Sequence, residues 1–220
     1  MDLELIQRII PTLFQAAIVT VEVAAMTLVL SLAVGAVIAV ARFSRFFPVR
    51  LLAASYVSVI RGTPVLVQLF IVFFGGPQVG LHLEPMAAAV ISFGFNLGAY
   101  MSEAIRGAIL AVDPGQREAA RSLGFSRAQT MRFFILPQAA PLMVRSIGVN
   151  TVVLVKSTAL ISTIGIVDLT YSAQRLVTST FKPFEVFGVT AVYYLVIIYG
   201  VAKAVDWLEA RFRNNESLAK

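Results

Sequence analysis

A lysine lies inside a long apolar stretch, where a charged side chain needs a specific reason to be. Lys156 is preceded by NTVVLV and followed by STALIST. A lysine at membrane depth normally faces a cavity or pairs with an acid, although its long stem can also carry the ammonium to the membrane surface. The polar residues around it in the sequence are Asn150, Thr151, Ser157 and Thr158. The stretch therefore predicts a cavity with a polar lining.

A second row of polar residues occurs in the apolar stretch 85–110. Asn96, Tyr100 and Glu103 recur at spacings of four and three, so they share one face of a helix. Asn96 and Tyr100 are suited either to contact with a solute or to holding two helices together. We expect Glu103 to pair with Arg106 on the same helix rather than with a solute.

The sequence Arg61-Gly62-Thr63-Pro64 interrupts the apolar stretch 49–74. Because Pro64 lacks a backbone N–H, the helix should break here, and a membrane tolerates a break only where it faces protein or a cavity. Arg61 is expected to bind the backbone carbonyls that the break leaves free. Gln68 lies one turn beyond the break and is expected to face the cavity.

The sequence lacks the residues that several kinds of chemistry require. The chain has no cysteine and one histidine, His82, so disulfides are excluded and a histidine-based metal site is not expected. A phosphate-binding loop needs glycine before its Lys-Ser pair, whereas Val155 precedes Lys156 and Ser157. We assign no catalytic residues and no metal ligands. We expect no cofactor in this chain and no ATP hydrolysis by it.

The composition indicates an all-α, polytopic membrane protein with a single domain, 1–220. Of its 220 residues, 58% are hydrophobic and 14% are charged, against about 25% charged in soluble domains. The net charge of +6 would also suit nucleic acid, but the charges lie between apolar segments, as membrane topology requires. About five segments approach or exceed the ~20 residues of a membrane span: 14–41, 49–74, 85–110, 140–167 and 184–206.

Arginine content predicts the orientation of these spans. The connections 42–50 and 106–145 are rich in arginine, whereas 75–85 contains neither lysine nor arginine. Positively charged connections remain on the cytoplasmic side. The N-terminus is therefore expected outside and the C-terminus in the cytoplasm, with 168–185 as an external loop.

The longest polar interruption, 113–137, reads DPGQREAARSLGFSRAQTMRFFILP. Asp113 followed by proline predicts a helix start, and Gln116 is placed to complete a capping box. Gly124 is expected to end this first helix in a left-handed conformation.

A second short helix should follow that glycine turn. Ser126 and Gln129 have the spacing of a capping box. Pro137 is expected to end or kink this helix. The stretch 113–137 is therefore predicted to be two capped helices joined by a tight turn.

This stretch resembles the cytoplasmic loop of the permease subunits of bacterial ABC importers. That loop reads Glu-Ala-Ala, three residues, Gly, nine residues, Ile, one residue, Leu-Pro. The matching residues are Glu118, Ala119, Ala120, Gly124, Leu136 and Pro137, with Phe134 at the Ile position. Gly98-Ala99-Tyr100 and Arg61-Gly62-Thr63-Pro64 look like the polar amino-acid branch of the same family.

The resemblance implies a multi-pass permease of the bacterial cytoplasmic (inner) membrane that works as a dimer with an identical or homologous permease. It implies a separate ATPase subunit, which holds ATP and Mg, and an external solute-binding protein. The stretch 113–137 would be the coupling helices. Their ATPase-docking surface would comprise Glu118, Ala119, Ala120 and Gly124, with both alanines exposed.

The resemblance also implies an amino-acid substrate. Lys156 would bind its carboxylate. The other lining residues would be Ser157, Thr158, Thr151, Asn150, Asn96, Tyr100 and Gln68. Because the fourth span has no acid before Asp168, a neutral polar or acidic amino acid is favoured over a basic one. An ion-coupled carrier or channel with a helical gate is the alternative, and a membrane scaffold is a third possibility.

Overall fold

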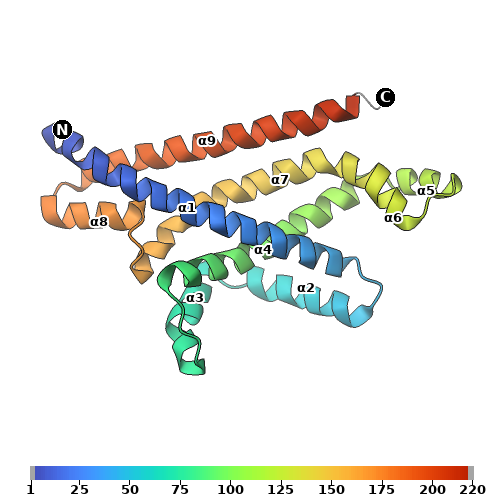
Figure 1. Cartoon of the computed structure of the whole chain (residues 1–220), viewed down its shortest axis with the longest axis horizontal. Helices are drawn as coiled ribbons and strands as arrows, with labels where there is room; N and C mark the ends of the chain where they lie inside the picture. The colour runs from blue at the N-terminus through green and yellow to red at the C-terminus, as the bar shows by residue number, and fades with distance from the viewer. Residues whose placement is uncertain (1–2, 218–220) are drawn as a thin grey trace.

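The computed structural model describes the backbone of residues 3–217 and the side chains of residues 3–212. Within these residues the chain is all-α, as the sequence predicts, and contains no strand (Figure 1). The helices and helical turns, in chain order, are α1 (Leu3–Arg42), α2 (Phe47–Arg61), α3 (Val65–Phe70), η1 (Ile71–Gly75), η2 (Gly76–Val79), α4 (Pro85–Ala111), α5 (Pro114–Ser122), α6 (Arg127–Thr130), η3 (Met131–Ile135), α7 (Leu136–Ser157), η4 (Thr158–Ile164), α8 (Leu169–Thr180) and α9 (Pro183–Ser217).

Three continuous helical segments of the described residues are long and apolar enough to cross a membrane: α1, the run 127–164, and 183–212 within α9. A fourth crossing is possible if α2 and 65–79, which meet at a bend of 102°, act as one broken span. α4 has 27 residues, enough for a hydrocarbon core of ~30 Å, but its polar row leaves it outside this apolar set. Each expected span thus contains helix, but the second is not straight.

Figure 1 shows long helices that run side by side, with short helices at the two ends of the bundle. The α5–α6 hairpin lies at one end. At the other end α8 packs against α1 and α9 through an apolar cluster that includes Leu13, Leu169 and Val186. The connection 168–185, expected to be an external loop, therefore contains a helix, α8. Asp168 caps α8, its Oδ1 accepting a hydrogen bond from the backbone N–H of Tyr171 at 2.8 Å.

Glycines allow α1 and α4 to approach closely. A Cβ atom built at Gly35 would lie 2.5 Å from Cβ of Met101, and one at Gly98 would lie 2.6 Å from Cγ1 of Val34. Small residues at such crossings let two membrane helices pack backbone to backbone. This contact fixes the position of α4, which carries the polar row.

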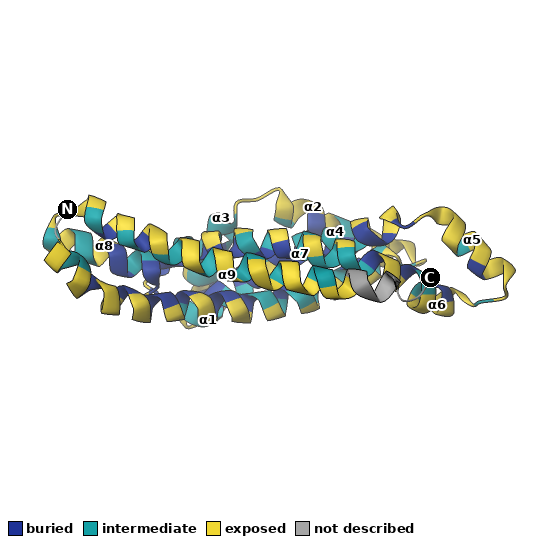
Figure 2. Cartoon of the chain, turned by 90° about the horizontal axis from the view of Figure 1, so that it is seen from above, coloured by how far each residue is buried: buried dark blue, intermediate teal, exposed yellow. Residues whose placement is uncertain are grey.

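The main apolar core joins α1, α3, α4 and α7. Its buried members include Val23, Leu69, Phe93, Met101 and Leu154. The outward faces of α1 and α9 are exposed along much of their length (Figure 2). They carry large apolar side chains, among them Val29, Val37, Val40, Leu195 and Val196. Such faces suit contact with lipid or with another membrane protein.

Candidate functional site

The chain turns sharply between α2 and α3. In a continuous helix the N–H of residue 64 would donate to the carbonyl of Ile60, but Pro64 has no N–H. The side chain of Gln68 replaces it, since its Nε2 donates to Ile60 O at 2.9 Å and to Thr63 Oγ1 at 2.6 Å. Gln68 therefore performs the structural role that the sequence suggested for Arg61.

Gln68 also ties the bend to α4. Its Oε1 accepts a hydrogen bond from Nδ2 of Asn96 at 3.1 Å. The bend is thus held on both sides, by its own carbonyls and by the neighbouring helix.

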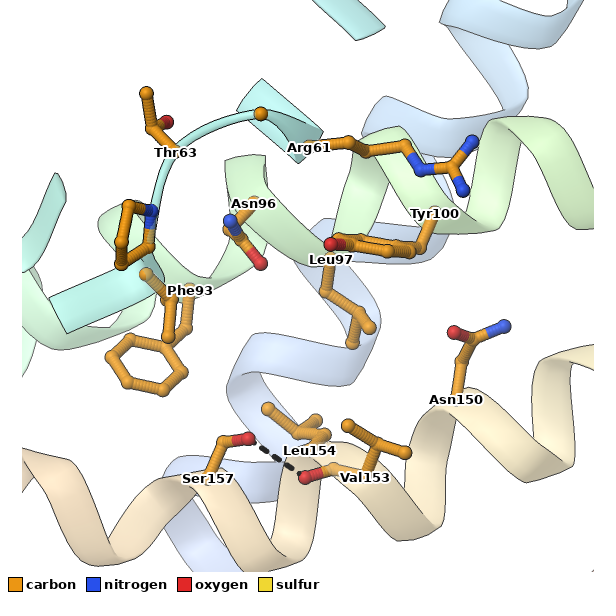
Figure 3. A pocket seen from close by; sticks show the side chains of 13 residues that line it. Arg61, Thr63, Phe93, Asn96, Leu97, Tyr100, Asn150, Val153, Leu154 and Ser157 are labelled. Atoms are coloured by element: carbon orange, nitrogen blue, oxygen red, sulfur yellow. Dashed lines mark hydrogen bonds between the residues drawn. The ribbon is translucent and has the colours of Figure 1, made fainter. Parts of the chain in front are cut away.

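A pocket of about 560 Å³ lies between the bend, α4 and α7. Its volume is in the range of small-molecule sites. The residues that line it are Arg61, Gly62, Thr63, Pro64, Val65, Phe93, Asn96, Leu97, Tyr100, Asn150, Val153, Leu154 and Ser157. Figure 3 shows side chains from all three elements facing the same space. Among the expected substrate-binding residues, the pocket brings together Asn96, Tyr100, Asn150 and Ser157.

Arg61 carries the single charge among the described residues that line this pocket. Its guanidinium carbon lies over the ring of Tyr100, 5.0 Å from the ring centroid (Figure 3). A cation–π contact of this kind holds the guanidinium beside the ring and leaves its N–H groups able to donate. A carboxylate that enters the pocket would therefore meet a cation that the Tyr100 ring already holds in position.

Two amide oxygens supply acceptors in the same pocket. Nδ2 of Asn96 donates to Gln68, and Nδ2 of Asn150 donates to the carbonyl of Ser146 at 2.9 Å. With the amides oriented by these bonds, neither Oδ1 has a hydrogen-bond partner within the described part of the chain. An ammonium group needs such acceptors. The lining can thus satisfy both ends of a zwitterion.

Several expected residues lie outside this pocket. Lys156 is exposed on α7 and does not line it. Thr151 and Thr158 are buried, and their hydroxyls donate to the carbonyls of Ile147 at 2.9 Å and Val155 at 2.7 Å. The side chain of Gln68 is hydrogen-bonded to the bend and to Asn96. For these residues a role in substrate binding stays a prediction.

Glu103 makes the expected pair with Arg106, at 2.7 Å. It also pairs with Arg42, at the end of α1, at 3.0 Å. The second partner was not expected, because the sequence does not show that the ends of α1 and α4 meet. The carboxylate therefore links two helices beside the pocket.

The α5–α6 hairpin begins with the expected cap. Asp113 Oδ1 accepts from the N–H of Gly115 at 2.7 Å. The capping box expected with Gln116 is wrong, because Oε1 of Gln116 instead accepts from Nε2 of Gln138 at 3.2 Å. This bond connects the start of α5 to the start of α7.

The turn between α5 and α6 is left-handed, as predicted. Gly124 has φ +84°, which glycine adopts without strain. The N–H groups of Gly124 and Phe125 donate to the carbonyls of Arg121 at 2.9 Å and Ala120 at 3.1 Å. These two bonds form a Schellman motif, which fixes the angle of the hairpin.

The second helix starts as predicted but does not stop where expected. Ser126 and Gln129 form a complete capping box. Of the two outcomes expected at Pro137, an end of the helix does not occur, since 127–164 is one continuous run. The preceding turn widens to π geometry, with the N–H of Leu136 donating to Met131 O. The wider turn makes room for the proline ring, so the hairpin continues directly into α7.

The expected docking residues differ in exposure. Glu118, Ala119 and Gly124 are exposed. Ala120 is 1% exposed, so the expectation that both alanines face outward is wrong. The reason is that α5 folds back onto α6 and η3, and Ala120 lies on the inner side.

Comparisons with known proteins agree over most of the chain. The family described as "Binding-protein-dependent transport system inner membrane component" matches residues 31–214. The glutamine transport system permease protein GlnP of Escherichia coli strain K12 is 34% identical over 206 residues, covering 93% of this chain and 94% of that protein. The nopaline transport system permease protein NocM of Agrobacterium fabrum is 36% identical over 227 residues, covering 97% and 94%.

A solved structure shares the fold. The structure titled "Crystal structure of an amino acid ABC transporter with histidines" superposes with a TM-score of 0.90 and is 36% identical. The match covers 96% of this chain and 99% of that one. The superposition therefore extends over nearly the whole of both chains.

Proposed function

This chain belongs to the family of binding-protein-dependent transport system inner membrane components, and from that premise we propose that it is the permease subunit of an ATP-driven amino-acid importer. The relatives named for glutamine and nopaline transport and the amino-acid transporter structure support this substrate class. The proposal includes a separate ATPase subunit, a second permease and an external solute-binding protein. It places the C-terminus and the hairpin in the cytoplasm.

The pocket beside the 102° bend is proposed as the amino-acid site. Arg61 would bind the substrate carboxylate through charge-assisted hydrogen bonds. The free Oδ1 atoms of Asn96 and Asn150 would accept from the substrate ammonium, with Tyr100 and Ser157 adding hydroxyls. The observation that carries this assignment is that one placed cation and two free acceptors line a single pocket.

The charge of the lining supports a neutral polar or acidic substrate. No acid is found among the described residues that line the pocket. A basic side chain would enter without a counter-charge and near Arg61, which is unfavourable away from water. The second permease would have to supply a carboxylate for a basic amino acid to bind well.

The hairpin 113–137 is proposed as the element that docks on the ATPase. Glu118, Ala119 and Gly124 would make the contact, while Ala120 would support it from inside. The continuous run 127–164 supports this proposal, because it joins the hairpin to Asn150 and Ser157 of the pocket without a flexible connection. Movement of a docked hairpin would then reach the pocket through a helix.

The carboxylate assignment competes with the sequence-based expectation for Lys156, and one experiment decides between them. The complete transporter, with its ATPase and binding protein, is reconstituted with Arg61→Met or Lys156→Met, which remove one charge each. We expect Arg61→Met to reduce substrate-stimulated ATP hydrolysis and uptake about tenfold or more, since a charge-assisted hydrogen bond contributes ~1.5–3 kcal/mol. Lys156→Met should retain most activity. The reverse result would reject the Arg61 assignment.

An ion-coupled carrier remains the alternative function. The two differ in energy source, because a carrier would be driven by an ion gradient alone. Uptake into vesicles is measured with ATP supplied and gradients collapsed by ionophores. Uptake that persists supports the importer, whereas uptake that stops despite ATP supports the carrier.

A further inference from the structure

A second, smaller pocket lies where the hairpin meets the end of α1. Its volume is about 160 Å³. The residues that line it are Phe43, Arg117, Arg121, Arg127, Thr130, Met131 and Ile135. Three arginines therefore face one small space, and the described residues that line it include no acid.

Arg117 is held in position but is not fully satisfied. Its Nη2 donates to the carbonyl of Ile109 at 3.0 Å, near the end of α4. Its Nε is buried and has no hydrogen-bond partner within the described residues. A buried N–H without an acceptor is unfavourable, so an acceptor supplied by a ligand would stabilise this arrangement.

Within the described side chains, no ion pair neutralises the pocket. The ion pairs found among residues 3–212 join Glu103 to Arg42 and Arg106, and none includes an arginine of this pocket. The Thr130 hydroxyl donates to Ser126 O at 2.9 Å, which leaves the arginines as the donors toward a ligand. The pocket thus offers several N–H donors and positive charge in a space suited to one small oxyanion.

We propose that this pocket binds the phosphate of an anionic phospholipid headgroup. The residues next to it favour a lipid source: Phe43, Phe46 and Phe47 are 40%, 65% and 59% exposed at the connection from α1 to α2. Exposed phenylalanines suit the boundary between lipid headgroups and acyl chains, and basic pockets between membrane spans bind lipid headgroups. A lipid seated here would contact the hairpin and the end of α1 together.

The test measures lipid retained by the full-length permease in complex with its ATPase, purified in mild detergent. Native mass spectrometry counts bound phosphatidylglycerol for the wild type and for Arg117→Gln. The matched control is Arg132→Gln, which removes the same charge from an exposed arginine of the same hairpin that lies over the Phe133 ring, outside the pocket. We expect about tenfold less lipid on Arg117→Gln and little change on the control.

Further variants distinguish a site with fixed hydrogen-bond geometry from a general attraction of anionic lipid to positive charge. Arg117→Lys keeps the positive charge but loses the planar guanidinium with its paired N–H donors. A site that depends on this geometry should therefore lose affinity for phosphate several-fold, about as much as a bidentate contact contributes. Arg127→Gln, at an exposed position, decides the matter if Arg117→Gln does not fold. Equal loss of lipid in the Arg132 control, or no loss with Arg117→Lys, would overturn the proposal.

Inorganic phosphate and acids of the ATPase are two other candidate occupants of the pocket, and each would give a distinct outcome. Excess inorganic phosphate that binds the lipid-free complex as tightly as phosphatidylglycerol would overturn the lipid assignment. So would loss of the ATPase from Arg117→Gln with lipid retention unchanged, because the arginines would then face acids of the ATPase. Loss of lipid with the ATPase retained supports the proposal, and this result is independent of whether the solute pocket is assigned correctly.

Discussion

Pro64 and Pro137 both interrupt the regular α-helical hydrogen bonding, with opposite results. At Pro64 the chain bends by 102° and a pocket opens beside the bend. At Pro137 the helix widens by one π turn and continues to residue 164. A glutamine side chain bonds a helix carbonyl in both places, Gln68 at Ile60 O and Gln138 at Phe134 O.

The neighbours of each proline account for the difference. Gly62 and Thr63 precede Pro64, and glycine lowers the resistance to leaving the helix. Large apolar residues precede Pro137, and Ile135 among them is buried in the cluster that joins η3 to α4, which holds the helix in place. Packing therefore keeps the helix continuous at Pro137, whereas the chain bends at Pro64. In this chain the first interruption borders a pocket, and the second leaves the helical run continuous.

The largest expected effect lies in the hairpin beyond the second interruption. Ala120→Arg places a charge on the buried side, so we expect the hairpin to lose its fold, at a cost of ~3 kcal/mol or more. The ATPase should no longer co-purify and the thermal midpoint of the permease should fall. Ala119→Arg, at the exposed neighbour, should weaken only the co-purification. Equal thermal midpoints for the two variants would contradict the inward placement of Ala120.

A smaller effect is expected at the first interruption. Gln68→Leu removes the 2.9 Å bond to the Ile60 carbonyl, which keeps only a 3.4 Å bond from the Thr63 hydroxyl. It also leaves the Asn96 amide without its partner, so we expect a destabilisation of ~1–3 kcal/mol. The pocket should distort, so uptake should fall several-fold while the ATPase stays bound. The measurements are uptake, co-purification and thermal unfolding of the reconstituted complex. Normal uptake by the variant would show that the hydrogen bonds of Gln68 are not needed to shape the pocket.

The smallest effect is expected from the matched change at the second interruption. Gln138→Leu removes bonds to Phe134 O and Gln116, both in exposed positions where water can replace them. We expect a change in unfolding free energy of ~1 kcal/mol or less and nearly normal uptake. A loss as large as that of Gln68→Leu would mean that the π turn depends on this side chain rather than on packing.

The sequence predicted local features well because their causes are local. The break at Pro64, the left-handed Gly124, the Ser126 capping box and the pair of Glu103 with Arg106 each depend on residues a few positions apart. Hydropathy and helix length gave the all-α membrane architecture for the same reason.

The sequence says less about contacts between distant segments. Lys156 stands among polar residues in the sequence, but the rotation of α7 directs Asn150 and Ser157 to the pocket and leaves Lys156 outside. The burial of Ala120 depends on how α5 folds back, and the Arg42 partner of Glu103 depends on how α1 crosses α4. Periodicity identifies the face of a helix but not what that face meets.

The most direct test of the pocket is its selectivity. Labelled uptake by the complete transporter is challenged with a panel of amino acids, for the wild type and for Asn150→Asp, which adds a carboxylate to the lining. We predict that neutral polar or acidic amino acids compete in the wild type and that lysine and arginine begin to compete in the variant. Two results would contradict the account. One is competition in the wild type by lysine, arginine and histidine alone, and the other is that Asn150→Asp does not change which amino acids compete.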